Sequence, residues 1–167
     1  LPCFRDISEE VLAIQRGIGK LTMAAKPERS RVAILWAPYN HYISRCLPFE
    51  ENGFSGTWMS NVSVIGGAVS DSLSLLQSLQ LRPTMVAPED VVRGDLGRRG
   101  FKVLVLPYNK GMSAAEAAAI RRFVSAGGLV IADNDPATYS QHGRKLKEPA
   151  LADLFPVTDR MHTQAHG

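Results

Sequence analysis

The stretch from Phe101 to Asp135 constrains the fold of this chain more than any other feature. It contains Val103–Leu106 and Leu129–Ala132, two continuous aliphatic and β-branched runs that are typical of strands buried on both faces of a parallel sheet. A helical pattern separates the two runs. Because strand–helix–strand crossovers within one sheet are right-handed, this stretch predicts two parallel strands joined by a right-handed crossover.

The helix of this unit has clear boundary signals. Ser113 and Glu116 form an S-x-x-E capping box, which satisfies two backbone amides of the first turn. Gly127 and Gly128 are suited to the left-handed exit. Apolar residues recur between them at helical spacing: Ala117, Ile120, Phe123 and Val124. The sequence therefore predicts an amphipathic helix that packs on the sheet.

The rest of the chain repeats this alternation. Strand signals occur at Arg31–Trp36 and Thr84–Val86, upstream of the two strands above. Helical patterns are predicted from a capping box at Asp6 and Glu9 through Lys20, then over Ser60–Leu79, Pro88–Val92 and Pro149–Phe155. Four short strands separated by helices indicate an α/β class protein, a flavodoxin-like three-layer sandwich with a mostly parallel sheet. We expect the strand order 2-1-3-4, with the strands of Val32 and Val103 side by side.

The domain organisation follows from these elements. At 167 residues the chain has the length of one ordinary domain. We expect an N-terminal linker and helix over 1–30, the α/β domain over 31–156 and a tail over 157–167. Because the first residue is Leu, we expect a processed product or a domain cut from a longer protein with a domain upstream.

Charge and composition argue against two kinds of partner. The net charge is only +3, and the basic residues are scattered rather than interleaved with aromatics, so we expect a solvated surface and no nucleic-acid partner. These residues include Arg93, Arg98, Arg99, Lys102, Arg121, Arg122, Arg144, Lys145 and Lys147. No apolar run is long enough to span a membrane, so we expect no membrane partner and a soluble protein, with the cytoplasm favoured and the compartment left open. Cys3 and Cys46 match no metal spacing, and free thiols are favoured over a disulfide.

The segment Ala37–Trp58 is expected to be a long loop. Long loops in compact domains usually serve a site, an interface or a lid. Aromatic side chains with a polar group are common at interfaces. The residues expected at an interface or at the rim of a site are Tyr39, His41, Tyr42, Phe54 and Trp58. The alternative is a loop that folds back on its own domain.

Polar residues follow three of the predicted strands. In a doubly wound sheet, ligands bind at the carboxyl ends of the strands, beside the point where the strand order reverses. The candidate pocket residues there are Asn40, Asn109, Asp133, Asn134 and Asp135. Asp133 and Asp135 suit paired acid–base chemistry, but acidic residues after a strand also cap turns, and the turn role is favoured. His41 is a candidate base, although a loop histidine without a special role is the simpler interpretation.

Other sequence signals of catalysis and cofactor binding are missing. Gly66-Gly67 lies inside a helical pattern and Gly127-Gly128 at a helix exit, so neither forms a phosphate-binding loop. No histidine, cysteine and carboxylate cluster has metal-ligand spacing, and there is no G-x-S-x-G elbow. We therefore predict no catalytic residue, no metal and no cofactor.

The core unit resembles a known family. The pattern Lys-Val-Leu-Val-Leu-Pro, Ser-x-x-Glu-Ala, Ile-x-x-Phe-Val-x-x-Gly-Gly and Val-Ile-Ala-Asp is similar to the class I glutamine-amidotransferase-like fold. More specifically, it resembles the trimerisation domain that follows the catalytic barrel in family 42 β-galactosidases. Ile14–Leu21 and Arg31–Ile34 resemble the junction between barrel and middle domain, and Tyr139–Gly143 is similar to the family's D/E-x-x-G loop. The resemblance spans about residues 10–145.

The resemblance implies a non-catalytic role. Amidotransferases carry a glycine pair and a cysteine elbow where this chain has Pro107–Lys110 and Asp133–Asp135, so no glutaminase activity is expected. The catalytic glutamates of the β-galactosidases lie in the barrel, which is not part of this sequence. The resemblance thus implies a domain for homotrimer assembly in a larger glycoside-hydrolase-like protein of carbohydrate metabolism, with an upstream barrel of the same chain as a partner.

Two alternatives remain open at this stage. One is a small-ligand or hydrolase-type site at the strand ends, built on His41, Asn109 and the aspartates. The other is a carbohydrate-binding module in which Trp36, Tyr39 or Trp58 forms a flat platform. A carbohydrate is therefore a further candidate partner.

Overall fold

The structure is a computed structural model that describes residues 2–25, 30–47, 58–133 and 135–155. For residues 2–5, 22 and 58–64 it describes the backbone alone. Phe54 and Asn134 therefore lie outside the described residues, and of Trp58 only the backbone is described.

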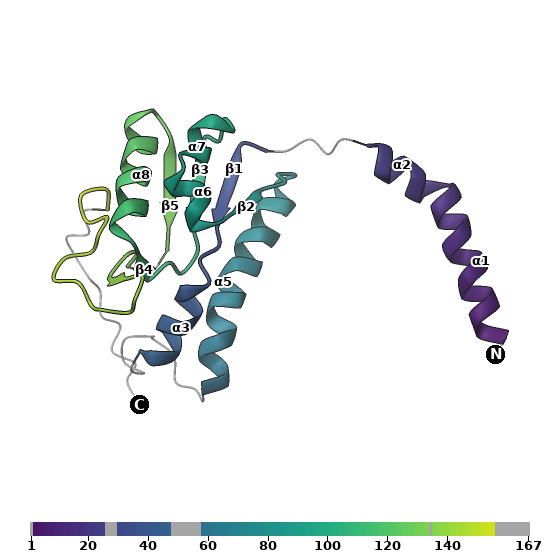
Figure 1. Cartoon of the computed structure of the whole chain (residues 1–167), viewed down its shortest axis with the longest axis horizontal. Coiled ribbons are helices and arrows are strands. Elements are labelled where there is room, and N and C mark those ends of the chain that lie inside the picture. Colours follow the sequence, from purple (N-terminus) through teal and green to yellow (C-terminus); the bar gives the residue numbers. More distant parts are fainter. Residues whose placement is uncertain (1, 26–29, 48–57, 134, 156–167) are drawn as a thin grey trace.

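The centre of the molecule is a four-stranded parallel sheet. Its strands are β1 (Val32–Leu35), β2 (Thr84–Val86), β3 (Val103–Leu106) and β5 (Leu129–Ala132). Their spatial order is β2-β1-β3-β5, and all three pairings are parallel. The expected strand order 2-1-3-4 is confirmed, as is a flavodoxin-like α/β fold with helices on both sides of the sheet (Figure 1).

Helices connect and flank these strands. They are α1 (Pro2–Arg16), α2 (Ile18–Ala24), α3 (Tyr39–Cys46), α5 (Trp58–Ser78), α6 (Pro88–Val92), α7 (Asp95–Arg98) and α8 (Ala114–Ser125). A small parallel ribbon pairs β4 (Gly111–Met112) with β6 (Tyr139–Ser140). The ribbon lies beyond the carboxyl end of β3 and joins the last part of the chain to the α/β body.

One face of the sheet is fully covered. The chain crosses from β2 to β3 through α6 and from β3 to β5 through α8, both in the same direction across the sheet, so right-handed crossovers place both helices on the same face. Alternate strand residues point to this face, among them Leu104 and Leu106, which are fully buried. They share a core with Ile120 and Phe123 of α8. This face holds the main hydrophobic core.

The opposite face is only half covered. The crossover from β1 to β2 runs the other way, which places α5 on this face near those two strands (Figure 1). Beside it, Val103 and Val105 of β3 are half-buried, and Leu129 and Ile131 of β5 are 56% and 50% exposed. The register pairs Val103 with Leu129 and Val105 with Ile131, so the four side chains share one face. We refer to these four residues as the open strip.

The N-terminal helices form an arm. α1 contacts α2, and Figure 1 shows both standing apart from the α/β body. Helix α1 begins at Pro2, so Asp6 and Glu9 lie inside it, and the prediction of a capping box at its start is wrong. Proline is favoured in the first helical turn, and nothing between Pro2 and Asp6 stops a helix from forming there.

Two further expectations are corrected by the structure. The segment Ala37–Trp58 is not a continuous loop, because α3 forms within it and buries Asn40, Ile43 and Ser44 on one side. Residues 48–57 lie outside the described part. Pro149–Phe155 is a series of turns rather than a helix, in which the amide of Ala152 donates to the carbonyl of Pro149 and the amide of Leu154 to the carbonyl of Leu151. The sequence also did not predict α7, β4 or β6, which are all very short.

Candidate functional site

Two predicted pocket residues meet at the carboxyl ends of the strands. Asn40, in the first turn of α3, donates from Nδ2 to Asn109 Oδ1 at 3.0 Å. Its Oδ1 accepts the amide of Gly111 at 2.6 Å, and Asn109 Nδ2 donates to the carbonyl of Pro107 at 3.1 Å. Asn40 and Asn109 are only 3% and 1% exposed. The pair therefore joins α3 to the loop after β3 by hydrogen bonds and does not face solvent.

A second buried contact joins α3 to α8. Tyr39 donates its hydroxyl to Glu116 Oε1 at 2.5 Å, while Glu116 Oε2 accepts the backbone amide of Ser113 at 2.9 Å. The Ser113 hydroxyl accepts the Glu116 amide, so the predicted capping box is confirmed. Burial, together with the Glu116 carboxylate, raises the pKa of Tyr39 well above its usual range. The phenol thus stays protonated and donates to a carboxylate that already caps a helix.

His41 lies on the same helix without a catalytic partner. Its ring packs edge-on against Trp36, with centroids 4.9 Å apart. Its Nε2 is buried and has no hydrogen-bond partner among the described residues. Burial, and to a smaller extent the charge of Arg45, lowers the pKa of His41. A general base normally has a carboxylate or a reacting proton in reach, and no carboxylate in the described part bonds Nε2 of His41.

The aspartates after β5 support the neighbouring turn. Asp133 Oδ1 accepts the backbone amide of Tyr108, which has a left-handed φ of 50°. Burial, with the Asp133 charge beside it, raises the pKa of the Tyr108 phenol. The carbonyl of Asp135 accepts the hydroxyl of Thr138 at 2.7 Å. Asp133 and Asp135 are both exposed, and neither carboxylate bonds Nε2 of His41.

A shallow cavity lies on the outer side of α3. Its volume is about 310 Å³. The lining residues are Tyr39, Tyr42, Ile43, Cys46, Leu47, Gln141, His142 and Gly143. Tyr42 is largely exposed at its rim, and Cys46 carries a free thiol. The cavity brings two of the predicted rim residues, Tyr39 and Tyr42, together with the loop at His142.

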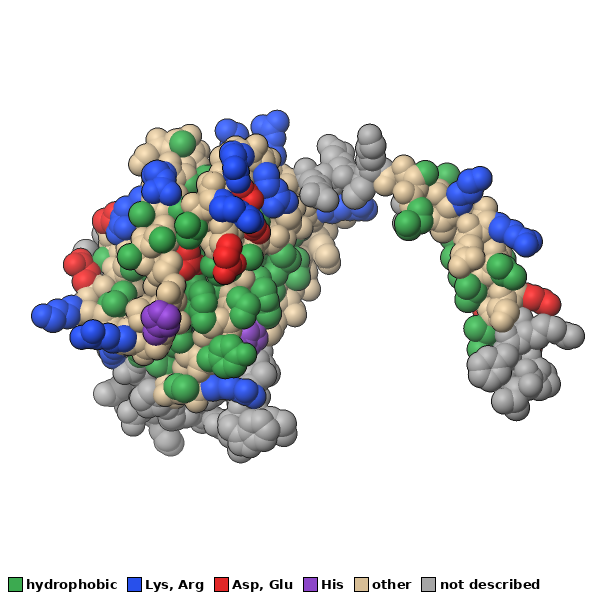
Figure 2. All heavy atoms as spheres, viewed as in Figure 1, with side chains coloured by type: hydrophobic (Ala, Val, Ile, Leu, Met, Phe, Trp, Pro, Cys, Tyr) green, Lys and Arg blue, Asp and Glu red, His purple; other side chains and the backbone are tan. Residues whose placement is uncertain are grey.

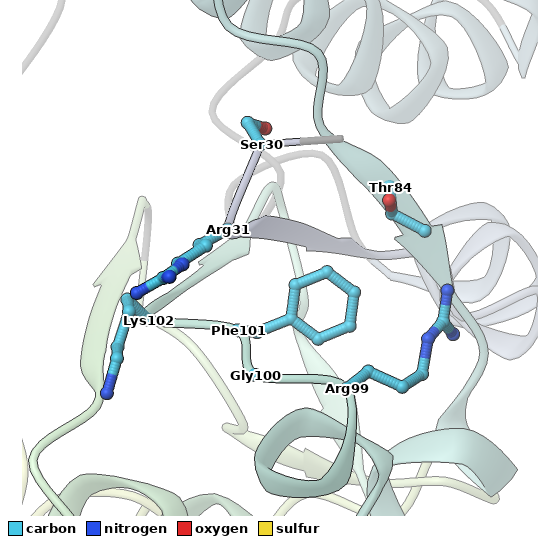
Figure 3. A pocket seen from close by; sticks show the side chains of 7 residues that line it. All are labelled: Ser30, Arg31, Thr84, Arg99, Gly100, Phe101 and Lys102. Atoms are coloured by element: carbon cyan, nitrogen blue, oxygen red, sulfur yellow. The ribbon is translucent and has the colours of Figure 1, made fainter. Parts of the chain in front are cut away.

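The structure also reveals a basic cavity that the sequence did not predict. It lies at the amino ends of β1, β2 and β3 and has a volume of about 640 Å³. The ring of Phe101 lies between Arg31 and Lys102 on one side and Arg99 on the other (Figure 3). The Arg99 guanidinium lies 5.1 Å from the ring centroid. Arg31 and Lys102 directly precede adjacent parallel strands, and this was the sequence signal for their proximity.

Two further properties bear on the kind of site. In the described ranges, no group of three or more histidine, cysteine, aspartate or glutamate residues is placed to hold a metal ion. None of the described helices combines the length and the apolar character needed to cross a membrane.

The fold and its strand-end contacts define a flavodoxin-like α/β domain, which can be compared with known proteins. No family model matches the sequence, and no curated protein matches it. The structure is similar to a β-galactosidase from Bifidobacterium adolescentis, with a TM-score of 0.58 and 18% sequence identity. The similarity covers 78% of this chain and 54% of that chain, so the chain spans about half the length of the β-galactosidase chain. At this identity the likeness shows the fold alone.

Proposed function

We propose that this chain is a non-catalytic, trimer-forming oligomerisation domain of a larger β-galactosidase-like glycoside hydrolase. The fold likeness to a β-galactosidase chain supports the class of the parent protein. The family pattern in Phe101–Asp135 supports the trimerisation role. The observation that carries the proposal is the half-covered face of the sheet.

That face has the character of a protein interface. A parallel sheet is normally covered on both faces, but the open strip exposes apolar side chains of β5. Next to it, α5 has one charged residue, Asp71, among its 21 residues, and Leu75 within it and Leu79 just after it are exposed. A Cβ at Gly66 or Gly67 would meet nothing within 4 Å, so packing among the described residues does not require these glycines.

The strand ends support a non-catalytic role. Asn40 and Asn109 bond to each other and to the backbone, and Asp133 holds the amide of Tyr108. A catalytic group has to reach a substrate, whereas these side chains hold α3 and the strand-end loops in place. The structural role of these residues agrees with the missing nucleophile elbow.

The molecular mass in solution tests the proposal. Sedimentation equilibrium of the full chain is expected to give a trimer of the 18.2 kDa protomer. Ile131→Asp puts a charge on the open strip and is expected to shift the mass toward the monomer. The matched control is Ala115→Asp, on the exposed side of α8. A wild-type monomer at all concentrations would contradict the proposal. The parent gene offers a second check: a (β/α) barrel with two glutamates at strand ends is expected upstream of Leu1.

A carbohydrate-binding role is the second candidate, favoured by the cavity next to Tyr42 and His142. Galactose titrated into the protein would then shift the amide resonances of the 139–143 loop, and Tyr42→Ala would abolish the shift. Tyr39 is less suited to a sugar platform, because its hydroxyl bonds Glu116. Absence of any shift at the solubility limit of galactose would exclude this role.

A further inference from the structure

We infer that the basic cavity at the amino ends of the strands binds a phosphorylated small molecule through its phosphate group. The cavity lies at the opposite end of the strands from the asparagine contacts and is not part of the open strip. The inference therefore does not depend on the proposed oligomerisation. Four features lead to it: its cations, an unpartnered hydroxyl, a rigid aromatic floor and its size.

The cations of the cavity come from two adjacent strand starts and one turn. Arg31 directly precedes β1, and Lys102 directly precedes β3. The amides of Lys102 and Val103 both donate to the carbonyl of Arg31, at 2.8 and 3.1 Å, so the two basic residues are fixed side by side. Arg99 lies on the other side of the Phe101 ring (Figure 3). The cavity is thus flanked by positive charge on both sides, and the blue side chains in Figure 2 show how widely basic residues are spread over the rest of the body.

No acidic side chain neutralises these cations within the described part of the chain. Arg31, Arg99 and Lys102 make no ion pair with a described residue. Asp95 lies within electrostatic range of Arg99, but its carboxylate bonds Arg98. The residues that line the cavity include neither aspartate nor glutamate. An anion that enters would therefore meet uncompensated positive charge.

A buried hydroxyl in the same cavity has no acceptor. Ser30 is held in place by its backbone amide, which donates to the carbonyl of Arg82 at 3.2 Å. Its Oγ is shielded from solvent and has no hydrogen-bond partner among the described residues. Buried hydroxyls are normally hydrogen-bonded, so this donor is free for a ligand oxygen. Thr84 of β2 adds a second hydroxyl to the lining.

The floor of the cavity holds one of the cations in position. Phe101 is only 6% exposed and belongs to the main hydrophobic core, so its ring is fixed. The Arg99 guanidinium lies 5.1 Å from the ring centroid, within the range of a cation–π contact. Gly100 has a left-handed φ of 71°, which lets the chain turn between the two residues. A cation held in this way loses less freedom when a ligand binds.

Charge and size favour a phosphate ester over a carboxylate as the ligand. A phosphomonoester carries a charge of about −1.5 to −2 at pH 7 and three strong acceptor oxygens. A carboxylate has one charge and two oxygens. Arginine pairs with phosphate through two parallel hydrogen bonds, and lysine binds it as a point charge. The cavity volume of about 640 Å³ lies within the range of small-molecule sites, so there is room for an organic part beside the phosphate.

Amide chemical shifts of the full chain test the inference. Glucose 6-phosphate, used as the probe, is expected to shift the resonances of residues 30, 31, 84 and 99–102 with saturation. Glucose is the uncharged match and should cause no shift. Glucuronate carries a carboxylate on the same ring and should bind several-fold more weakly. Inorganic phosphate distinguishes the two sources of the group: weaker binding than the ester supports an organic ligand, and equal binding assigns the cavity to free phosphate.

Two matched double variants separate a built site from general attraction. Arg31→Gln with Lys102→Gln should weaken binding of glucose 6-phosphate by roughly tenfold or more, since each removes a charged hydrogen-bond donor. Arg144→Gln with Lys147→Gln removes the same charge from exposed positions after β6 and should leave binding unchanged. Ser30→Ala should weaken it by roughly two- to fivefold. Equal urea midpoints would confirm that the variants fold.

Several results would overturn the inference. They are a lack of saturation up to about 10 mM glucose 6-phosphate, shifts confined to other residues, and equal losses from the two double variants. Glucuronate that binds as tightly as the ester would also overturn it, because the site would then not select phosphate. Affinity should fall below about pH 6, where the phosphate takes up its second proton. Sedimentation reports on assembly alone, so this inference and the proposed function fail separately.

Discussion

The two faces of the sheet are built from the same strands and the same kinds of residue, yet they differ sharply in burial. On the covered face, Leu104 and Leu106 are fully enclosed by α6 and α8. On the open face, their neighbours in sequence, Val103 and Val105, are only half-buried, and Leu129 and Ile131 are half exposed. The sequence of a parallel strand thus shows that both faces need cover. It does not show whether the same chain supplies that cover.

The largest expected difference comes from truncating one side chain on each face. Leu104→Ala should lower the free energy of unfolding by about 2–5 kcal/mol, because it leaves a cavity in a closed core. Ile131→Ala should cost less than about 1 kcal/mol in the monomer, because half of that side chain is already in water. Urea denaturation at low protein concentration measures both. Equal losses would mean that the open strip is covered within the chain.

Removal of the Glu116 carboxyl group at the start of α8 is expected to have the next largest effect. Glu116→Ala removes the acceptor of both the Tyr39 hydroxyl and the Ser113 amide, and leaves two part-buried donors without it. We expect a loss of about 1–3 kcal/mol. Glu116→Gln keeps an acceptor and should cost less, and Tyr39→Phe in the Glu116→Ala background should recover part of the loss. Thermal denaturation of the wild type, Glu116→Ala, Tyr39→Phe and the double variant forms the double-mutant cycle. An absence of coupling would contradict the contact.

Two glycines allow a matched comparison between the buried Asn40–Asn109 contact and the open face of the sheet. A Cβ at Gly111 would lie 2.2 Å from Ile43 Cδ1, so Gly111→Ala should destabilise by about 1–3 kcal/mol. A Cβ at Gly66 in α5 would meet nothing within 4 Å, and Gly66→Ala should stabilise the monomer by about 0.5–1 kcal/mol through helix propensity. Urea midpoints measure both changes. If Gly66→Ala weakens the trimer while stabilising the monomer, the interface includes α5.

The smallest expected effect is the pH dependence from His41. Folding lowers the pKa of His41 below its usual value of 6.5. At a pH between the folded and the unfolded pKa, the unfolded chain therefore binds more protons than the folded chain. Stability is therefore complete above pH 6.5 and falls as the pH drops toward the folded pKa. His41→Gln should flatten this part of the curve, with the exposed His142→Gln as control. Identical slopes for wild type and His41→Gln, measured by denaturation at several pH values, would show that His41 is not buried as described.

Several parts of the fold could be predicted from sequence because they depend on local signals. The four strands are continuous apolar runs, and the capping box at Ser113 and Glu116 marks the start of α8 directly. The strand order followed from the flavodoxin-like order of doubly wound sheets. In contrast, α3 was missed because its segment is rich in proline, glycine and aromatic residues, and only one short side of it is apolar. The strands β4 and β6 have two residues each and pair across a long stretch of chain, so no local pattern reveals them.

The candidate site shows the same limit. The sheet topology correctly brought Asn40 and Asn109 to the same edge, but whether they face solvent depends on where their side chains turn. The carbonyl of Pro107 holds Asn109 locally, whereas Asn40 is held inward by the amide of Gly111 and by Asn109 itself, and these last two are tertiary contacts. The cavity around Phe101 was missed because its cations lie at the amino ends of the strands, where sequence reasoning did not look for a site.

The most direct test of the account is the mass of the protein in solution, with and without a charge on the open strip. Sedimentation equilibrium should give three times the 18.2 kDa protomer mass for the unmodified chain and a mass near 18.2 kDa for Ile131→Asp, with Ala115→Asp unchanged. An unmodified chain of 18.2 kDa, or a trimer that Ile131→Asp leaves intact, would contradict the claim that the half-covered face of the sheet is an interface between copies.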